Sequence, residues 1–449
     1  MVTHRIQAFA IRISFLAAVL VVANAFPRTA VSATGSHDCA SWRGDVDLGR
    51  LTWNIGVTET APGEFSVDVP SMWRAREIVH GTEQDKRITL ELPYALGKLE
   101  ATVVRCVLVG KIVRQDGNSG SIAWKPRAVV SRTRTEMQFD VNGTHIAATL
   151  VRPATTQSVP LVVVLHGGGD SSRSDSPPYT FWGEELSALG YAVLLYDKRG
   201  NGGSSGDWRN VSFDERAADV AEMIKVLVGR HDIDAHRIGL LAVSQGGWVA
   251  IRVAQLSERI SFIVSIGAPA VSPREADTFV SWLASRTAGL TAAEADERLV
   301  LWNAYVDYIG GGTTDQEWSR LKQLVDASKS RPWFARRPFD PTERHDWFVD
   351  WYARVLNFDP VPALRSMNIP MLWLYGARDT QSDVARNVSL LSQLCNREDK
   401  PYQIAAFAGA DHGVLLTEKG AKGDDDYFTA APGFLATIED WLANRQGGR

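Results

Sequence analysis

The segment Ala242-Val243-Ser244-Gln245-Gly246-Gly247 decides the fold of this chain, because it joins two different hydrophobic patterns. Residues 237–243 end in an apolar run that predicts a buried strand, and residues 247–256 predict a helix. A serine at such a turn is exposed on a tight, strained bend that tolerates only small neighbours. Gly246 fills the trailing small position, and Ala242 stands where the leading glycine is more usual. We therefore expect Ser244 to be a nucleophile.

A second glycine-rich segment, His166-Gly167-Gly168-Gly169, follows the apolar run at residues 161–165. Glycines allow the backbone to bring N–H groups close to a substrate carbonyl oxygen. We expect the N–H of Gly168 to be one oxyanion donor, with Gly169 as a close competitor. The N–H of Gln245, at the start of a helix, is the second expected donor. His166 is expected to hold this loop by hydrogen bonding.

An acid and a base follow Ser244 in the chain order Ser…Asp…His. A serine hydroxyl is a poor nucleophile until an imidazole takes its proton and a carboxylate orients that imidazole. Asp379 follows the apolar run at residues 371–375, and His412 lies in the loop after the next predicted strand. Asp383 is the rival acid, but it falls where a helix should begin and is typical of a first-turn acid. The expected catalytic set is Ser244, Asp379 and His412.

Two regions follow the N-terminal segment, and the second of them contains a helical insertion. Residues 38–128 alternate apolar and polar side chains and predict a small β-rich domain. Residues 135–449 begin with a hairpin at Asn142-Gly143 and then alternate strands with helices, which predicts a mostly parallel sheet covered by helices on both faces. Within them, about residues 272–367 are helical in period and rich in tryptophan. We expect a helical cap there, whose tryptophans form its core or line a substrate pocket.

Residues 1–33 have the pattern of a secretory signal peptide. Arg5 and Arg12 precede the apolar residues 13–22, and Ala23-Asn24-Ala25 is a small-x-small cleavage pattern. Cleavage is expected near residue 25 or 33. The apolar run is shorter than the roughly 20 residues that span a bilayer. We therefore expect an exported protein, periplasmic or secreted, with no stable membrane span after processing.

Composition and the absence of certain motifs exclude some classes of partner and cofactor. A net charge of −4 argues against a nucleic-acid partner, and no metal-binding motif is present, so neither a metal nor another cofactor is expected. The chain has three cysteines. Cys39 and Cys106 are free to pair in an oxidising compartment or to stay unpaired, and Cys106 is placed in an extended run at residues 103–109. Cys395 is expected to be a buried free thiol.

The segment Asp197-Lys198-Arg199-Gly200 continues into a run rich in glycine and serine. It lacks the Gly-Lys-Ser/Thr ending of a phosphate-binding loop. We therefore expect a structural turn near the active site, with a local ion pair between Asp197 and Arg199.

Together these residues resemble the α/β-hydrolase superfamily from about residue 135 to the C-terminus. Tyr196-Asp197-Lys198-Arg199-Gly200 and Val243-Ser244-Gln245-Gly246-Gly247 are similar to segments of exported bacterial esterases related to serine aminopeptidases and prolyl-oligopeptidase-like enzymes. Members of that branch often carry a β-rich N-terminal extension. The resemblance implies Ser244 as nucleophile, Asp379 as acid and His412 as base, and hydrolysis of esters, less often of amides, without a cofactor.

Three functions therefore stand as hypotheses. The first is a serine esterase that acts on a small-molecule ester. The second is an exported serine peptidase that acts on short peptides, with the substrate amine held by cap acids such as Glu294, Asp296 and Glu297. The third is a binding or scaffold protein that keeps the fold without activity.

Overall fold

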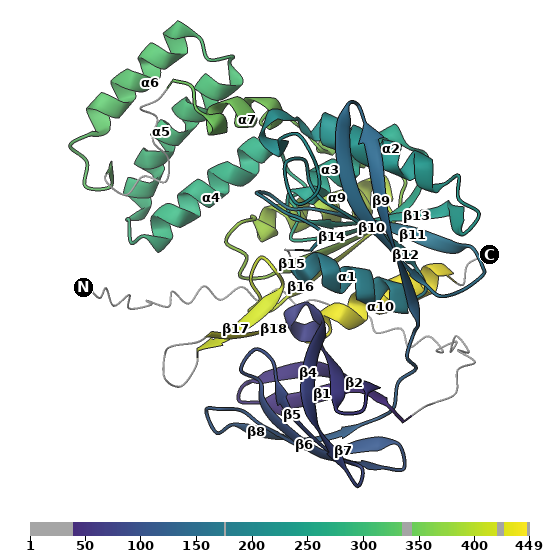
Figure 1. Cartoon of the computed structure of the whole chain (residues 1–449). Coiled ribbons are helices and arrows are strands. Elements are labelled where there is room, and N and C mark those ends of the chain that lie inside the picture. Colours follow the sequence, from purple (N-terminus) through teal and green to yellow (C-terminus); the bar gives the residue numbers. More distant parts are fainter. Residues whose placement is uncertain (1–38, 175–176, 335–343, 420–425, 447–449) are drawn as a thin grey trace. The chain divides into compact units, whose positions relative to one another are not determined.

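The computed structural model describes residues 39–174, 177–334, 344–419 and 426–446 (Figure 1). The predicted signal peptide lies outside these residues. Two eight-stranded sheets and a two-stranded hairpin make up the β structure of the described chain. No helix within the described ranges is long and apolar enough to cross a membrane.

The central sheet has the strand order β16-β15-β14-β13-β11-β12-β10-β9. The strands from β12 to β16 run parallel, and β10 and β9 form an antiparallel edge. Every residue of β11 and β12 is buried, as the continuous apolar runs predict. The bounds are β9 Arg132–Val141, β10 Thr144–Pro153, β11 Val159–Leu165, β12 Ala192–Tyr196, β13 Ile233–Val243, β14 Ile260–Ile266, β15 Met371–Gly376 and β16 Tyr402–Phe407.

The hairpin that opens this sheet has the predicted turn. Asn142 and Gly143 have φ values of 50° and 76°. Positive φ at both central residues is typical of a type I′ turn, which matches the twist of the flanking strands.

Helices cover both faces of the central sheet, which confirms the predicted α/β-hydrolase architecture (Figure 1). Two helices, α1 Pro177–Ala188 and α10 Phe434–Gln446, contribute to the apolar core on one face. Three others, α2 Phe213–Leu227, α3 Gly246–Leu256 and α9 Val384–Glu398, pack on the opposite face. The parallel strands therefore end in loops that are held rigidly from two sides.

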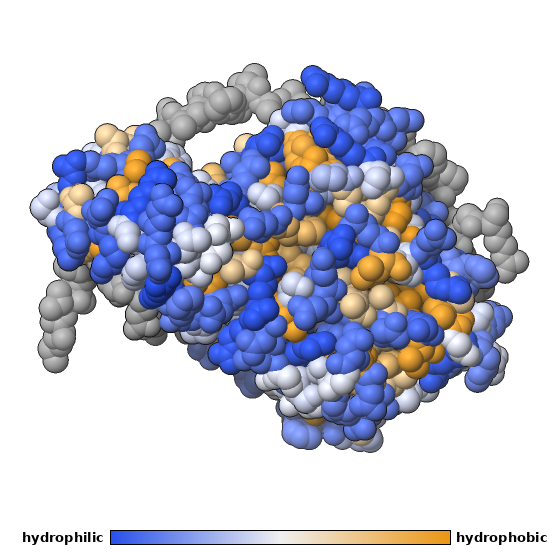
Figure 2. Space-filling model, turned by 90° about the horizontal axis from the view of Figure 1, so that it is seen from above, coloured by the Kyte–Doolittle hydropathy of each residue, from blue (hydrophilic) through white to orange (hydrophobic). Residues whose placement is uncertain are grey.

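Within the described residues, five helices interrupt the alternation between β14 and β15. They are α4 Pro273–Thr287, α5 Ala292–Gly310, α6 Asp315–Ser328, α7 Trp347–Val355 and α8 Val361–Ser366. We call α4 to α7 the helical cap. Trp302 and Trp333 are buried in the core, whereas Trp347 is 57% exposed. Figure 2 shows that apolar surface is also present on the face seen from above, on which the cap forms the left-hand lobe.

The second large sheet is an antiparallel meander of strands β1 to β8, which lies within the predicted β-rich region. Its bounds are β1 Ser41–Leu48, β2 Leu51–Ala61, β3 Glu64–Val69, β4 Arg74–Gln84, β5 Arg87–Leu92, β6 Gly97–Val104, β7 Val107–Val113 and β8 Ser119–Trp124. Cys106 is not in an extended run as predicted. It forms the β6–β7 turn with Arg105, and both residues have positive φ. This turn brings Cys106 to Cys39, and the two cysteines form a disulfide.

A hairpin that sequence analysis missed, β17 Leu415–Lys419 with β18 Asp426–Ala430, packs beside the meander. Thr429 donates a hydrogen bond to the carbonyl of Thr52, at 3.0 Å. This hairpin follows the loop that carries His412, so the meander supports the region next to that loop.

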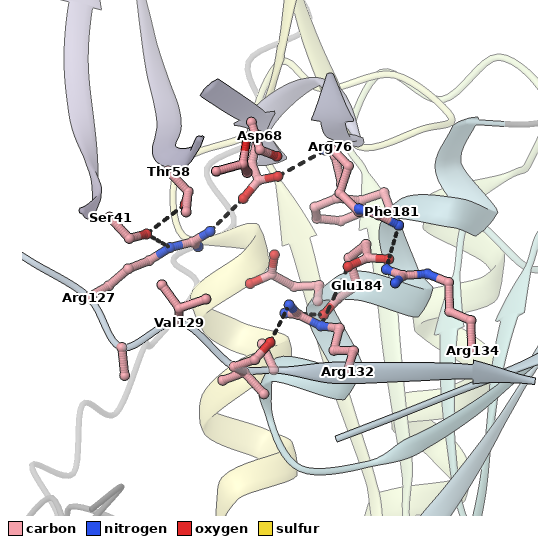
Figure 3. Close-up of a pocket in the computed structure, with 17 residues that line it drawn as sticks. Ser41, Thr58, Asp68, Arg76, Arg127, Val129, Arg132, Arg134, Phe181 and Glu184 are labelled. Carbon is pink, nitrogen blue, oxygen red and sulfur yellow. Dashed lines mark hydrogen bonds and ion pairs between the residues drawn. The ribbon is translucent and has the colours of Figure 1, made fainter. Parts of the chain in front are cut away.

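Charged side chains also join the meander to α1. They line a cavity of about 240 Å³, whose lining side chains are drawn in Figure 3. Glu184 of α1 forms ion pairs with three guanidinium groups, those of Arg76, Arg132 and Arg134, and its side chain is only 9% exposed. Among the described residues that line this cavity, none is Ser244, Asp379 or His412.

Candidate active site

Ser244 occupies the tight turn between β13 and α3. Its φ of 52° lies in the left-handed region, which is uncommon for a residue with a side chain and is typical of a strained functional turn. The turn needs Gly246, because a Cβ there would lie 2.8 Å from the carbonyl oxygen of Leu165. The Ser244 amide donates to the carbonyl of Ile266 at 2.8 Å, which ties the turn to the end of β14. Ser244 is half-buried.

Asp379 and His412 are brought together from two loops at the same edge of the sheet. Oδ2 of Asp379 lies 2.7 Å from Nδ1 of His412. The Asp379 side chain is fully buried, and that of His412 is 17% exposed. The other carboxylate oxygen of Asp379 accepts the Gln381 amide at 2.7 Å. A buried carboxylate with these two contacts fixes the orientation of the imidazole.

Asp383, the rival acid, has a structural role at the start of a helix. Asp383 is the N-cap of α9, and its side chain accepts the amide of Arg386 at 3.0 Å. This is the helix-terminus role that the sequence favoured for Asp383.

Ser244 and His412 contact two consecutive residues at the end of β14, Ile266 and Gly267. Ser244 is bonded to Ile266, as described above. A Cβ built on Gly267 would lie 3.2 Å from Cε1 of His412 and 2.7 Å from its carbonyl oxygen. Gly267 therefore allows the imidazole to lie directly against the backbone next to the nucleophile turn.

The backbone amides expected as oxyanion donors are those of Gly168 and Gln245. Neither the amide of Gly168 nor that of Gln245 has a hydrogen-bond partner within the part of the chain that the structure describes. The two residues are neighbours, since a Cβ on Gly168 would lie 3.8 Å from Nε2 of Gln245. Free backbone donors beside a serine are what an oxyanion hole requires.

Buried polar side chains that sequence analysis did not assign to the site form hydrogen bonds with the carbonyl oxygens of the glycine-rich loop. Lys198 donates hydrogen bonds to the carbonyl oxygens of Gly167 and Gly169, at 2.7 and 2.5 Å. Arg216 donates to the carbonyl of His166 at 3.3 Å and to Oε1 of Gln245 at 2.6 Å. The only sequence signal for Lys198 was its position two residues after the end of a buried strand.

His166 lies beneath this loop as a neutral packing residue. Its ring is 4.5 Å from the ring centroids of both Tyr179 and Tyr196, edge-on. Burial lowers the pKa of His166 well below its ordinary value, as do Lys198 and Arg216, and a hydrogen bond to the Tyr196 backbone opposes them. Because Nδ1 has no partner among the described residues, packing holds this side chain more than the expected hydrogen bonding does.

The predicted ion pair between Asp197 and Arg199 is wrong. Asp197 is bonded to Arg173 and to the amide of Gly203, whereas Arg199 forms two hydrogen bonds with Asp219, both at 2.6 Å. Asp197 directly follows β12, whereas Arg199 lies in the turn that comes next, and each side chain has its partner on a different element. The segment is nevertheless a tight turn beside the site, as expected.

The helical cap reaches the glycine-rich loop through aromatic rings. Trp208, in the short helix η2 Trp208–Asn210, donates from Nε1 to Asp170, which directly follows Gly169, at 2.6 Å. Trp347 and Trp351 of α7 pack edge-on against Trp208, with centroid distances of 6.4 and 5.6 Å. The exposed ring of Trp347 is therefore part of the aromatic cluster that connects the cap to the glycine-rich loop.

The cap acids that would anchor a peptide amine already have partners. Glu294 completes the capping box of α5 with Thr291. Asp296 accepts Nε1 of Trp282 at 3.0 Å, and Glu297 is bonded to Arg331 and Trp333. In the described residues no cluster of histidine, cysteine and acidic side chains is placed to hold a metal ion.

The sheet order and the Asp379–His412 pair at its edge define an α/β-hydrolase. The family model described as serine aminopeptidase, S33, matches residues 156–419, more than half of the chain, and the chain belongs to that family. This agrees with the resemblance recognised from the two sequence motifs.

Two of the curated relatives match shorter parts of the chain. The chain is 29% identical to the quorum-quenching protein AidA of Acinetobacter baumannii over 30% of this chain and 44% of AidA. It is 30% identical to an uncharacterized protein of Mycobacterium tuberculosis over 39% of this chain and 59% of that protein. The chain thus spans about half the length of these relatives. It is 23% identical to the polyketide transferase claH of Penicillium crustosum, over 63% of this chain and 85% of claH.

Solved structures resemble the chain at low identity. An esterase of Pyrococcus furiosus is 17% identical, with a TM-score of 0.43, over 72% of this chain and 94% of the esterase. Est1E from Butyrivibrio proteoclasticus, with ferulic acid bound, is 13% identical, with a TM-score of 0.42, over 69% of this chain and 97% of Est1E.

Proposed function

We propose that this protein is a serine hydrolase that cleaves carboxylic esters through an acyl-enzyme, with Ser244 as nucleophile, His412 as base and Asp379 as the orienting acid. The 2.7 Å contact between Asp379 and Nδ1 of His412 carries the proposal. It fixes the tautomer in which Nδ1 bears the proton, which leaves Nε2 as the nitrogen that can take a proton from Ser244. The Ser244 turn is bonded to Ile266, and the imidazole packs against the next residue, Gly267, which supports this pairing.

The chemistry follows in two halves. His412 takes the hydroxyl proton as Ser244 attacks the ester carbonyl, and the protonated imidazole then donates that proton to the leaving alkoxide. Water next attacks the acyl-enzyme with the same histidine as base, and the carboxylic acid leaves as Ser244 recovers its proton. The free amides of Gly168 and Gln245 would stabilise the oxyanion in both halves.

The cap favours an ester over a peptide as substrate. A peptidase that trims short peptides needs a carboxylate to hold the free amine, and Glu294, Asp296 and Glu297 each have a structural partner. Exposed Trp347 instead offers an apolar surface that packs on Trp208, the side chain that is bonded to Asp170 at the end of the glycine-rich loop. A small-molecule ester with an apolar acyl or alkyl group matches these surroundings.

Side-by-side turnover of p-nitrophenyl esters and aminoacyl-p-nitroanilides tests this choice. We expect kcat/KM to be higher for esters by at least about 100-fold, a difference of about 2.7 kcal/mol in transition-state stabilisation. A chain-length series of acyl groups would identify the preferred ester. Faster hydrolysis of the anilides would establish the peptidase instead.

We also propose that the protein is exported, to the periplasm or the medium. The signal-peptide pattern at residues 1–33 supports this, as does the disulfide between Cys39 and Cys106, because disulfides persist in oxidising compartments. Cell fractionation with mass analysis of the mature N-terminus tests it. We expect a processed chain that starts after residue 25 or 33, and an unprocessed chain in the cytoplasm would contradict export.

A further inference from the structure

Lys198 is buried beneath the glycine-rich loop, and the proposed chemistry has not used it. Only 3% of the residue is exposed. Lysine is rarely buried to this extent without a carboxylate partner. Here Nζ is instead bonded to two backbone carbonyl oxygens, those of Gly167 and Gly169. Burial of Lys198 therefore costs desolvation free energy, which the two hydrogen bonds and the contact of Nζ with the Trp208 ring, 5.2 Å from its centroid, offset.

The bond to Gly167 determines where the next amide points. In a trans peptide the C=O of one residue and the N–H of the next lie in one plane and point in opposite directions. The described chain contains no cis peptide bond. Because Nζ holds the Gly167 carbonyl beneath the loop, the N–H of Gly168 must point away from Lys198.

The neighbouring amides are arranged differently. The N–H of Gly167 donates to the hydroxyl of Tyr179 at 3.1 Å, so it is already engaged. The orientation of the Gly169 amide follows from the carbonyl of Gly168, which Lys198 does not contact. Lys198 thus orients the Gly168 amide, the one that we expect in the oxyanion hole, rather than its competitor.

Three consecutive glycines make such a support necessary. Glycine populates both signs of φ readily, so a Gly-Gly-Gly peptide plane can flip at little cost unless something holds it. Gly169 already has a φ of 73°. A flipped Gly167–Gly168 peptide would present a carbonyl oxygen to the substrate oxyanion and repel it.

We propose that Lys198 is a positioning residue that holds the Gly167–Gly168 peptide so that the Gly168 N–H faces the oxyanion. The proposal rests on the proposed serine-hydrolase function. Lys198 touches neither the substrate nor the reacting atoms, and acts only through the two carbonyls. Burial lowers its pKa well below the ordinary value, and Arg216 nearby lowers it further. A neutral amine still has the two N–H groups that the two carbonyls need.

Lys198→Met tests this role because methionine keeps the length of the stem and removes both donors. Rates are measured with the preferred ester and divided by the active sites titrated with a fluorophosphonate. We expect kcat to fall about 100- to 1,000-fold, the effect of losing one oxyanion donor, with little change in KM. Affinity for a trifluoromethyl ketone, which forms an oxyanion with the serine, should fall by a similar factor.

Arg199→Met is the matched control. Arg199 lies in the same turn and loses a partly buried ion pair with Asp219, but it does not contact the glycine-rich loop. We expect this variant to lose thermal stability while kcat per titrated site stays near that of the wild type. If Lys198→Met does not fold, Lys198→Gln replaces it, since the shorter amide cannot reach both carbonyls.

The two proposals fail differently. If the wild type hydrolyses esters and Lys198→Met keeps its kcat and its ketone affinity, the positioning role is overturned and the serine-hydrolase function stands. An equal loss in Arg199→Met would also overturn it, because general destabilisation would then explain both. If folded wild type neither hydrolyses the substrates nor reacts with the fluorophosphonate, the proposed function itself fails.

Discussion

His412 is bonded through Nδ1 to Oδ2 of Asp379 at 2.7 Å, although 33 residues separate the two along the chain. We predict that Asp379→Asn lowers kcat by about 1,000- to 10,000-fold, because an amide holds the imidazole in the wrong tautomer and does not stabilise its cation. Folding should be retained, since asparagine has the same shape. Steady-state kinetics on the preferred ester, with circular dichroism of the variant, measures both.

Asp383→Asn is the natural comparison for that variant. Asp383 caps α9 through the amide of Arg386, and asparagine caps helices about as well as aspartate. We expect wild-type kinetics and a melting temperature within about 2 °C of the wild type, as for a change well under 1 kcal/mol. An equal loss of kcat in both variants would mean that Asp379 has no special role.

The contact between Gly267 and His412 yields a second prediction. In Gly267→Ala the new Cβ would lie 2.7 Å from the carbonyl oxygen of His412, which must then shift. We expect kcat to fall at least about 10-fold, as a displacement near 1 Å can do. Gly289→Ala has comparable backbone strain, with φ of 87°, but no atom within 4 Å, so it should keep kcat.

The guanidinium groups around Glu184 come from two sheets, Arg76 from β4 of the meander and Arg132 and Arg134 from β9 of the central sheet. Glu184→Gln leaves Arg76, Arg132 and Arg134 without their shared carboxylate. Because the three guanidinium groups are partly exposed, losing the hydrogen bonds to this carboxylate should cost about 1.5–3 kcal/mol, which still lowers the denaturant midpoint. Glu222→Gln removes an exposed pair with Lys225 and should have almost no effect. Similar midpoints for the two variants would exclude Glu184 as an important contact.

Glu439 of α10 predicts a pH dependence of stability. Burial raises its pKa to about 7, as does nearby Glu185, while Arg43 opposes the shift. A carboxyl whose pKa is raised by folding binds more protons in the folded state, so its contribution to stability is present at low pH and is lost as pH rises from about 4.5 to about 7. Glu439→Gln should flatten this part of the profile and be the more stable form above pH 7. Thermal unfolding from pH 4.5 to 8 measures this, and parallel profiles would contradict it.

Local patterns were enough to predict most of the α/β core. The runs at residues 260–266 and 402–407 coincide with β14 and β16. The apolar run predicts β14 because a central parallel strand is buried on both faces, whereas β16 is a mostly half-exposed edge strand. Asp379 and His412 could be singled out because parallel strands end at one edge, so residues after different strands meet there. Chain order alone therefore predicted a contact between distant residues.

Side-chain partners and short irregular elements could not be predicted in this way. Cys106 lies in an apolar run without glycine, and nothing local marks the turn at that position. The β17–β18 hairpin is too polar and short to have a strong periodic signal. Arg199 and Lys198 have partners on other elements, so their roles become visible only once the turn and the glycine-rich loop are placed side by side.

Labelling with a fluorophosphonate tests the central claim most directly, because the reagent reacts only with a serine that a base has activated and an oxyanion hole supports. We predict that the folded wild type takes up one equivalent, that peptide mapping locates it on Ser244, and that Ser244→Ala takes up none. Folded wild-type protein that stays unlabelled, or a label that persists in Ser244→Ala, would contradict the account.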